Sequence, residues 1–223
     1  MKKNLLALAF LVGLLTCCKS EDAPIKPVKP TDPGSINKEY MSRAETTFAN
    51  IFKYYWSDKV RMMFGSYPNT LGTPQEPSSP DYDSHAYLWG LGSVVSAFNA
   101  IVQNTDNVDF RMTYESRLKE TLLKYYNTTK EPMCFGCFVN PHDQRLYDDA
   151  IWVGIDLADL YSKTKDSWYL DYAKSVWNFV LSGKDDELGG GVYWDENAKD
   201  SKNTCSNAPA VAVSYTHLTL PTI

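Results

Sequence analysis

Two adjacent acidic residues, Asp148 and Asp149, stand at the start of a strongly apolar segment. Such a pair can cap a helix, because Asp accepts hydrogen bonds from free backbone N–H groups and suits the positive end of the helix dipole. It could also supply the nucleophile and the acid of a retaining glycosidase, whose two carboxyl groups lie about 5 Å apart across one bond. Neighbouring side chains in a helix point about 100° apart, which permits that geometry. Both interpretations stay open on the motif alone.

A second candidate segment is the glycine run 189–191, which the aromatic residues Tyr193 and Trp194 follow closely. Glycine-rich loops can bind phosphate, but that motif needs a strand before it and Lys-Ser/Thr after it, and this sequence has neither. We therefore expect a short turn that exposes Tyr193 and Trp194, whose rings would suit a sugar ligand.

The cysteines after the leader are Cys134, Cys137 and Cys205. The spacing of Cys134 and Cys137 is compatible with a local disulfide, a redox pair or two zinc ligands. Zinc is disfavoured because only His142 lies nearby and a second cysteine pair is missing. Redox catalysis is disfavoured because no βαβ pattern surrounds the motif. We expect a local disulfide or buried free thiols.

The first 18 residues are typical of a bacterial lipoprotein signal peptide. Lys2 and Lys3 precede an apolar stretch, 5–15, that is too short to span a bilayer. The sequence Thr16-Cys17-Cys18 resembles a lipobox, with Cys18 as the lipidated residue. We therefore expect export and a lipid anchor at the outer membrane, at the cell surface; ordinary secretion is the alternative.

Residues 19–35 contain four prolines and no apolar period, so we expect an extended linker ahead of a domain over residues 36–212. That domain is long enough to bury a real core. The net charge of −5 and the pI near 5.2 leave no basic stripe for nucleic acid. A neutral or weakly charged extracellular ligand fits this charge better.

Apolar residues at helical spacing predict an all-α domain. Five helices are expected at about 38–56, 91–102, 114–125, 148–162 and 169–180, and a sixth starts with Asn207 as its N-cap. No alternating strand pattern competes with them. The fourth helix is apolar nearly all round, so it should be buried on most sides. This places the aspartate pair at the mouth of an interior helix.

The helices come in pairs, with long loops rich in glycine, proline and aromatic residues between the pairs. This arrangement suggests an α/α toroid whose loops form one open face. The loop over residues 65–85 is long for a connection in a compact domain, which favours a functional or a disordered segment.

Three stretches of the sequence are similar to glycoside hydrolase family 76, the endo-acting α-1,6-mannanases. They are Phe138-Val139-Asn140 leading to Tyr147-Asp148-Asp149, the turn 189–194, and the segment 202–210. Their order and spacing also fit, and the resemblance covers about residues 36–212. It implies an (α/α)6 barrel, α-mannan as substrate, retention of configuration, and no cofactor or metal.

The resemblance also implies roles for individual residues. Asp148 corresponds to the nucleophile and Asp149 to the general acid/base. Tyr193, Trp194 and Asn207 match positions near the cleft and are expected to contact substrate.

Trp89 and His85 are further candidates for the cleft. A histidine such as His85 can equally be a satisfied residue at the start of a helix.

An (α/α)6 barrel needs about twelve helices, so this chain is expected to hold roughly the first half of one. Residues 213–223 abandon helical spacing and resemble translated vector sequence; a divergent native C-terminus is the alternative. A half-toroid would expose apolar surface, so we expect the 223-residue chain to be poorly soluble and inactive by itself.

Two other functions compete with a mannanase. One is a different (α/α)6 carbohydrate enzyme, such as an unsaturated-uronide hydrolase or an epimerase, but these attract anionic sugars or use histidines, of which this chain has three. The other is a non-catalytic glycan-binding lipoprotein, in which the aspartates cap a helix and bind hydroxyls.

Overall fold

The computed structural model describes residues 33–68, 85–139 and 144–219. The predicted signal peptide with Cys18, most of the linker, most of the loop 65–85, and His142 lie outside these ranges. The chain divides into two compact units after Lys38, and the second, Glu39–Ile223, carries the fold. Among the described helices, none is both long enough and apolar enough to cross a membrane.

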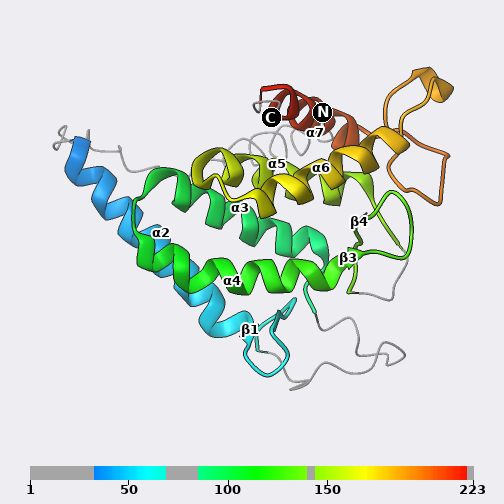
Figure 1. Cartoon of the computed structure of the whole chain (residues 1–223). Coiled ribbons are helices and arrows are strands. Elements are labelled where there is room, and N and C mark those ends of the chain that lie inside the picture. The colour runs from blue at the N-terminus through cyan, green and yellow to red at the C-terminus, as the bar shows by residue number, and fades with distance from the viewer. Residues whose placement is uncertain (1–32, 69–84, 140–143, 220–223) are drawn as a thin grey trace, which may run out of the picture. The chain divides into compact units, whose positions relative to one another are not determined.

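The described part of the chain is helical, as the sequence predicts (Figure 1). Its helices are α2 (Pro33–Tyr55), α3 (Leu88–Asn104), α4 (Val108–Tyr125), α5 (Tyr147–Thr164), α6 (Ser167–Ser182) and α7 (Thr204–Thr219), with a 3₁₀ turn, η2, at Glu187–Gly189. Two antiparallel pairs of two-residue strands, which the sequence did not predict, join β1 (Trp56–Ser57) to β2 (Met62–Met63) and β3 (Tyr126–Asn127) to β4 (Cys134–Phe135).

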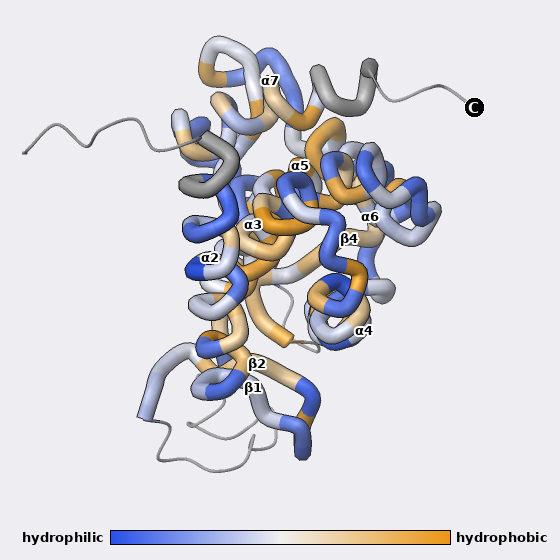
Figure 2. Tube along the Cα trace, turned by 90° about the vertical axis from the view of Figure 1, so that its left-hand side faces the viewer, coloured by the Kyte–Doolittle hydropathy of each residue, from blue (hydrophilic) through white to orange (hydrophobic). Residues whose placement is uncertain are grey.

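Helix α5 is the central element, packed against α3, α6 and α7. The prediction that it is buried on most sides is confirmed, since Ala150, Ile151 and Val153 are each fully buried. Gly154 lets α6 approach closely, because a Cβ there would lie 2.6 Å from a methyl group of Val176. In Figure 2 the apolar colour concentrates on α3 and α5, whereas α2 carries long hydrophilic stretches.

A cluster of aromatic rings joins α2 to α3 and α4. The ring centroid of Phe48 lies 6.0 Å from that of Phe98 on α3 and 5.3 Å from that of Phe110 on α4. Phe52, one turn further along α2, packs 4.6 Å from Tyr114. Such tilted and edge-on contacts add to the gain from burying the rings themselves.

Three predicted helix boundaries differ in the structure. Helix α2 begins at Pro33, because proline suits the first turn of a helix, where its missing N–H has no helical partner. The prediction that Asn207 is an N-cap is wrong: α7 begins at Thr204, and the carbonyl of Asn203 accepts the backbone N–H groups of Ser206 and Asn207. The predicted end of helical geometry near residue 213 is also wrong, since α7 continues to Thr219. The origin of residues 213–223 stays a prediction.

Candidate active site

Backbone pairing brings the loop after α6 against the start of α5. The backbone N–H of Tyr147 donates to the carbonyl of Trp194 at 3.0 Å, and that of Glu196 donates to the carbonyl of Arg145 at 3.3 Å. Leu146 and Asp195 form the β-bridge between these two contacts. The aspartate pair therefore lies beside Trp194, although Asp148 and Trp194 are 46 positions apart in the sequence.

A buried ion pair holds this junction together. The guanidinium of Arg145 is fully buried and donates to both carboxylate oxygens of Glu196, at 2.8 Å through Nε. A further guanidinium nitrogen donates to the carbonyls of Lys130 and Pro132, in the β3–β4 connection. The Arg145 side chain thus joins two segments, the loop after α6 and the β3–β4 connection, to the start of α5.

Asp148 is 7% exposed and binds two donors. Its Oδ1 accepts the backbone N–H of Asp149 at 3.1 Å, so the residue satisfies one free N–H of its own helix, as a capping role requires. Its Oδ2 accepts the indole N–H of Trp194 at 3.2 Å. The thiol of Cys205, at the start of α7, is also a hydrogen-bond neighbour.

Asp149 is 8% exposed and has a different environment. Burial, reinforced by the nearby charge of Asp148, raises its pKa to about 6. The thiol of Cys137 opposes this shift by hydrogen bonding to the Asp149 carboxyl. Asp149 therefore keeps its proton to a higher pH than an ordinary aspartate, as a general acid requires.

Asp149 opens onto a cavity of about 310 Å³ between α3 and α5. Two half-exposed tryptophans lie on its wall, Trp89 of α3 at 54% exposed and Trp152 of α5 at 42% exposed. Ser93 and Ser96 of α3 contribute hydroxyl groups. Aromatic faces beside hydroxyls and a carboxyl group suit a carbohydrate ring.

The structure brings Trp89 to this cavity, as the sequence suggested, but the role of Trp152 was not predicted. Its signal was present, since Trp152 follows Asp149 by three residues and so shares its helix face. The cysteines near the dyad, Cys137 and Cys205, were also not assigned to the site. Sequence spacing gave no indication that the three-dimensional fold would bring either thiol to a carboxyl group.

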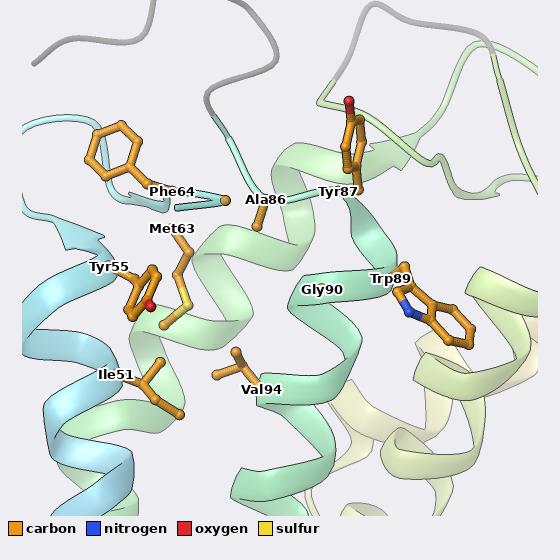
Figure 3. A pocket seen from close by; sticks show the side chains of 10 residues that line it. Ile51, Tyr55, Met63, Phe64, Ala86, Tyr87, Trp89, Gly90 and Val94 are labelled. Carbon is orange, nitrogen blue, oxygen red and sulfur yellow. The ribbon is translucent and has the colours of Figure 1, made fainter. Parts of the chain in front are cut away.

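A second cavity, of about 440 Å³, lies on the other side of Trp89, between α2 and α3. Figure 3 shows Ile51, Tyr55 and Met63 grouped in it, whereas the indole of Trp89 points away from them. His85 stacks on Phe64, with ring centroids 6.1 Å apart, and is 6% exposed. His85 does not line the cavity at Asp149, so the structure does not bring it to the aspartate pair.

The prediction that the glycine turn exposes Tyr193 is wrong, because Tyr193 is only 3% exposed. Its hydroxyl bonds to Asp185, and the ammonium of Lys202 lies 4.5 Å from its ring centroid. The turn thus buries Tyr193 against the ion pair that Lys202 forms with Asp185. Trp194, which is half-buried, points instead to Asp148.

Asn207 organises the turn rather than the cavity. Its side-chain amide accepts the backbone N–H of Val192 at 2.8 Å and donates to the Val192 carbonyl at 2.9 Å. Gly191, at φ +87°, is needed because a Cβ there would lie 2.3 Å from the Asn207 amide oxygen. Substrate contact by Tyr193 and Asn207 stays a prediction that these contacts do not support.

Of the two expected states of Cys134 and Cys137, a local disulfide or buried free thiols, the structure has the second. Burial raises the pKa of both, that of Cys134 to about 12. Within residues 33–68, 85–139 and 144–219, no group of three or more His, Cys, Asp or Glu side chains is arranged to hold a metal ion.

Comparison with known proteins decides the family. The profile of glycosyl hydrolase family 76 matches residues 39–216. The chain belongs to glycosyl hydrolase family 76. Its architecture is accordingly the first half of an (α/α) barrel, with the aspartate pair on helix α5. A search of the curated proteins finds no match.

Solved structures of the family have the same fold. A family 76 mannosidase from Bacteroides thetaiotaomicron VPI-5482 is 24% identical, with a TM-score of 0.66 over 80% of this chain and 48% of that one. A family 76 hydrolase from a bovine strain of B. thetaiotaomicron is 28% identical, with a TM-score of 0.65 over 81% of this chain and 38% of that one. The chain thus spans half or less of the length of these relatives.

The α-1,6-mannanase of Salegentibacter sp. HEL1_6 is 19% identical, with a TM-score of 0.58 over 81% of this chain and 45% of that one. A variant of that enzyme with two consecutive aspartates replaced by alanine is described as inactive and binds α-1,6-mannotetrose.

Proposed function

We propose that the complete domain to which this chain contributes is a retaining endo-glycosidase that hydrolyses α-1,6-mannosidic bonds. The observation that carries the proposal is the asymmetry of the aspartate pair. Asp148 accepts two N–H donors, whereas burial beside Asp148 raises the pKa of Asp149 to about 6. The raised pKa of Asp149 suits a general acid, and the Asp148 carboxyl group lies beside it as the candidate nucleophile.

In the first step, a carboxylate oxygen of Asp148 bonds to the anomeric carbon while the glycosidic C–O bond breaks. The proton of Asp149 passes to the departing oxygen. The ester that forms on Asp148 removes the negative charge that raises the pKa of Asp149.

In the second step, Asp149 is ionised and takes a proton from water as the water oxygen bonds to the anomeric carbon. The bond to Asp148 breaks, and both carboxyl groups return to their starting states. Two displacements on opposite faces give net retention.

The substrate class is supported by the relatives and by the cavity. A related mannanase binds α-1,6-mannotetrose when its two consecutive aspartates are replaced. In this chain, Trp89 and Trp152 flank the opening to Asp149, where they could stack on successive sugar rings. The proposed chemistry needs no cofactor, because the two carboxyl groups supply both the nucleophile and the proton.

We further propose that Cys18 carries a lipid anchor that holds the protein at the outer membrane, facing the polysaccharide. The basis is the sequence of residues 1–18. We also propose that the 223-residue chain is inactive alone, because it spans half or less of its relatives.

The test is digestion of linear α-1,6-mannan by a chain that carries the complete family domain. We expect oligosaccharides of several lengths from the wild type and a loss of at least about 10³-fold in Asp148→Asn and Asp149→Asn. Asp200→Asn, on an exposed aspartate, is the matched control. Binding of mannan without release of any oligosaccharide would establish the glycan-binding lipoprotein instead. Cleavage of uronides alone would overturn the substrate.

A further inference from the structure

Cys137, which follows strand β4, lies beside Asp149 at the start of α5. Its thiol is a hydrogen-bond partner of the Asp149 carboxyl and also accepts from the backbone N–H of Leu146, the N-cap residue of α5. Leu146 has no side chain able to cap the helix. The sulfur therefore stands at the mouth of α5, between the helix start and the carboxyl group.

Backbone hydrogen bonds fix the position of this thiol. The N–H of Cys137 donates to the carbonyl of Gln144 at 2.9 Å, and its carbonyl accepts the N–H of Leu88, the first residue of α3, at 2.9 Å. Cys137 is 4% exposed. It is thus held between the starts of the two helices that form the cavity.

We propose that Cys137 is a positioning residue for the acid/base carboxyl: its buried thiol donates to Asp149 and holds the carboxylate in one orientation toward the glycosidic oxygen. The inference rests on the proposed function and extends it. A thiol is a weak donor, so it supports the ionised carboxylate without holding the charge too firmly. Asp149 can then accept a proton and release it within one catalytic cycle.

Burial raises the pKa of Cys137 itself, and the charge of Asp149 adds to that effect, so the thiol keeps its proton while Asp149 cycles. Among the described residues, the groups that act on Asp149 are Asp148, on the same helix, and Cys137. Helix α3 presents Trp89 and serines to the cavity but no titratable side chain, and α7 places Cys205 against Asp148. The strength of the hydrogen-bond donor at position 137 should therefore change the pKa of Asp149 directly.

The test compares Cys137→Ala with Cys137→Ser in a chain that carries the complete family domain. Alanine removes the donor, so the alkaline limb of kcat/KM, which reports the general acid, should move up by about half a pH unit. Serine is a stronger donor, so the same limb should move down by a similar amount, about half a unit. Cys134→Ser, on a buried thiol of the same hairpin that is not a neighbour of Asp149, is the control and should leave the limb in place.

A second readout does not depend on activity. The carboxyl ¹³C titration of Asp149, followed by NMR in the complete domain without substrate, should show the same opposite shifts from its midpoint of about 6. Shifts of both variants in one direction, or no shift, would overturn the role of Cys137. If the complete domain releases nothing from α-1,6-mannan while the NMR shifts are opposite, the proposed function fails and the contact between Cys137 and Asp149 stands.

Discussion

Replacement of Asp149 by Asn should stabilise the fold, by an amount that depends on pH. The pKa of Asp149 is raised from an ordinary 3.8 to about 6, mainly by burial. Below about pH 3 the carboxyl group is neutral in both the folded and the unfolded chain, so it adds no penalty. Above about pH 7 it is ionised in both, and the folded state then bears a cost of about 3 kcal/mol. Asn is nearly isosteric and cannot ionise, so it removes this cost.

The difference in unfolding free energy between Asp149→Asn and wild type should therefore grow by about 2 kcal/mol from about pH 4.5 to about pH 8. Urea denaturation followed by tryptophan fluorescence measures it, at sub-micromolar concentration where aggregation is slowest. Asp200→Asn, on an exposed residue, is the matched control and should show no such growth. If the variant gains nothing on going to high pH, the asymmetry inferred for the two carboxyl groups is wrong.

The remaining predictions concern the residues that support the aspartate pair and the solubility of the chain. Arg145→Met leaves the Glu196 carboxylate buried without its main partner, so it should lower the free energy of unfolding by about 3–5 kcal/mol. Adding Glu196→Gln removes the buried charge and should restore part of that loss. Urea titration of the single and double variants measures both effects. Gly191→Ala should destabilise the fold by about 2 kcal/mol or more, because its Cβ would clash with Asn207. Gly189 has a similar positive φ but no atom within 4 Å of its Cβ position, so Gly189→Ala should cost only about 1 kcal/mol. Thermal unfolding of the two variants measures the difference. The 223-residue chain should sediment with aggregates in ultracentrifugation, whereas the complete domain stays in solution.

Periodicity was sufficient to predict the helices and the burial of α5. The apolar residues of that helix cover nearly all of its circumference, so only an interior position can satisfy them. The aspartate pair could be placed at its mouth for the same reason. The two-residue strands were missed because so short a ladder carries no alternating pattern.

The side chains of the glycine turn could not be assigned from sequence. Tyr193 and Trp194 are neighbours of similar character, and only the pairing of Trp194 with Tyr147 decides that Trp194 faces Asp148 while Tyr193 is buried. The start of α7 was misjudged because Asn207 is a good N-cap residue by type. In the structure, its amide is engaged by the backbone of Val192 instead.

The central claim is that Asp148 and Asp149 divide the roles of nucleophile and acid/base, and azide rescue tests it most directly. Alanine variants of each residue, in the complete domain, would be given an aryl α-1,6-mannobioside and azide, and the anomeric configuration of the glycosyl azide read by NMR. We expect a β-azide from Asp148→Ala, because azide enters on the face that the nucleophile has vacated. We expect an α-azide from Asp149→Ala, because azide displaces Asp148 from the covalent intermediate. The opposite assignment of products, or the same anomer from both variants, would contradict it.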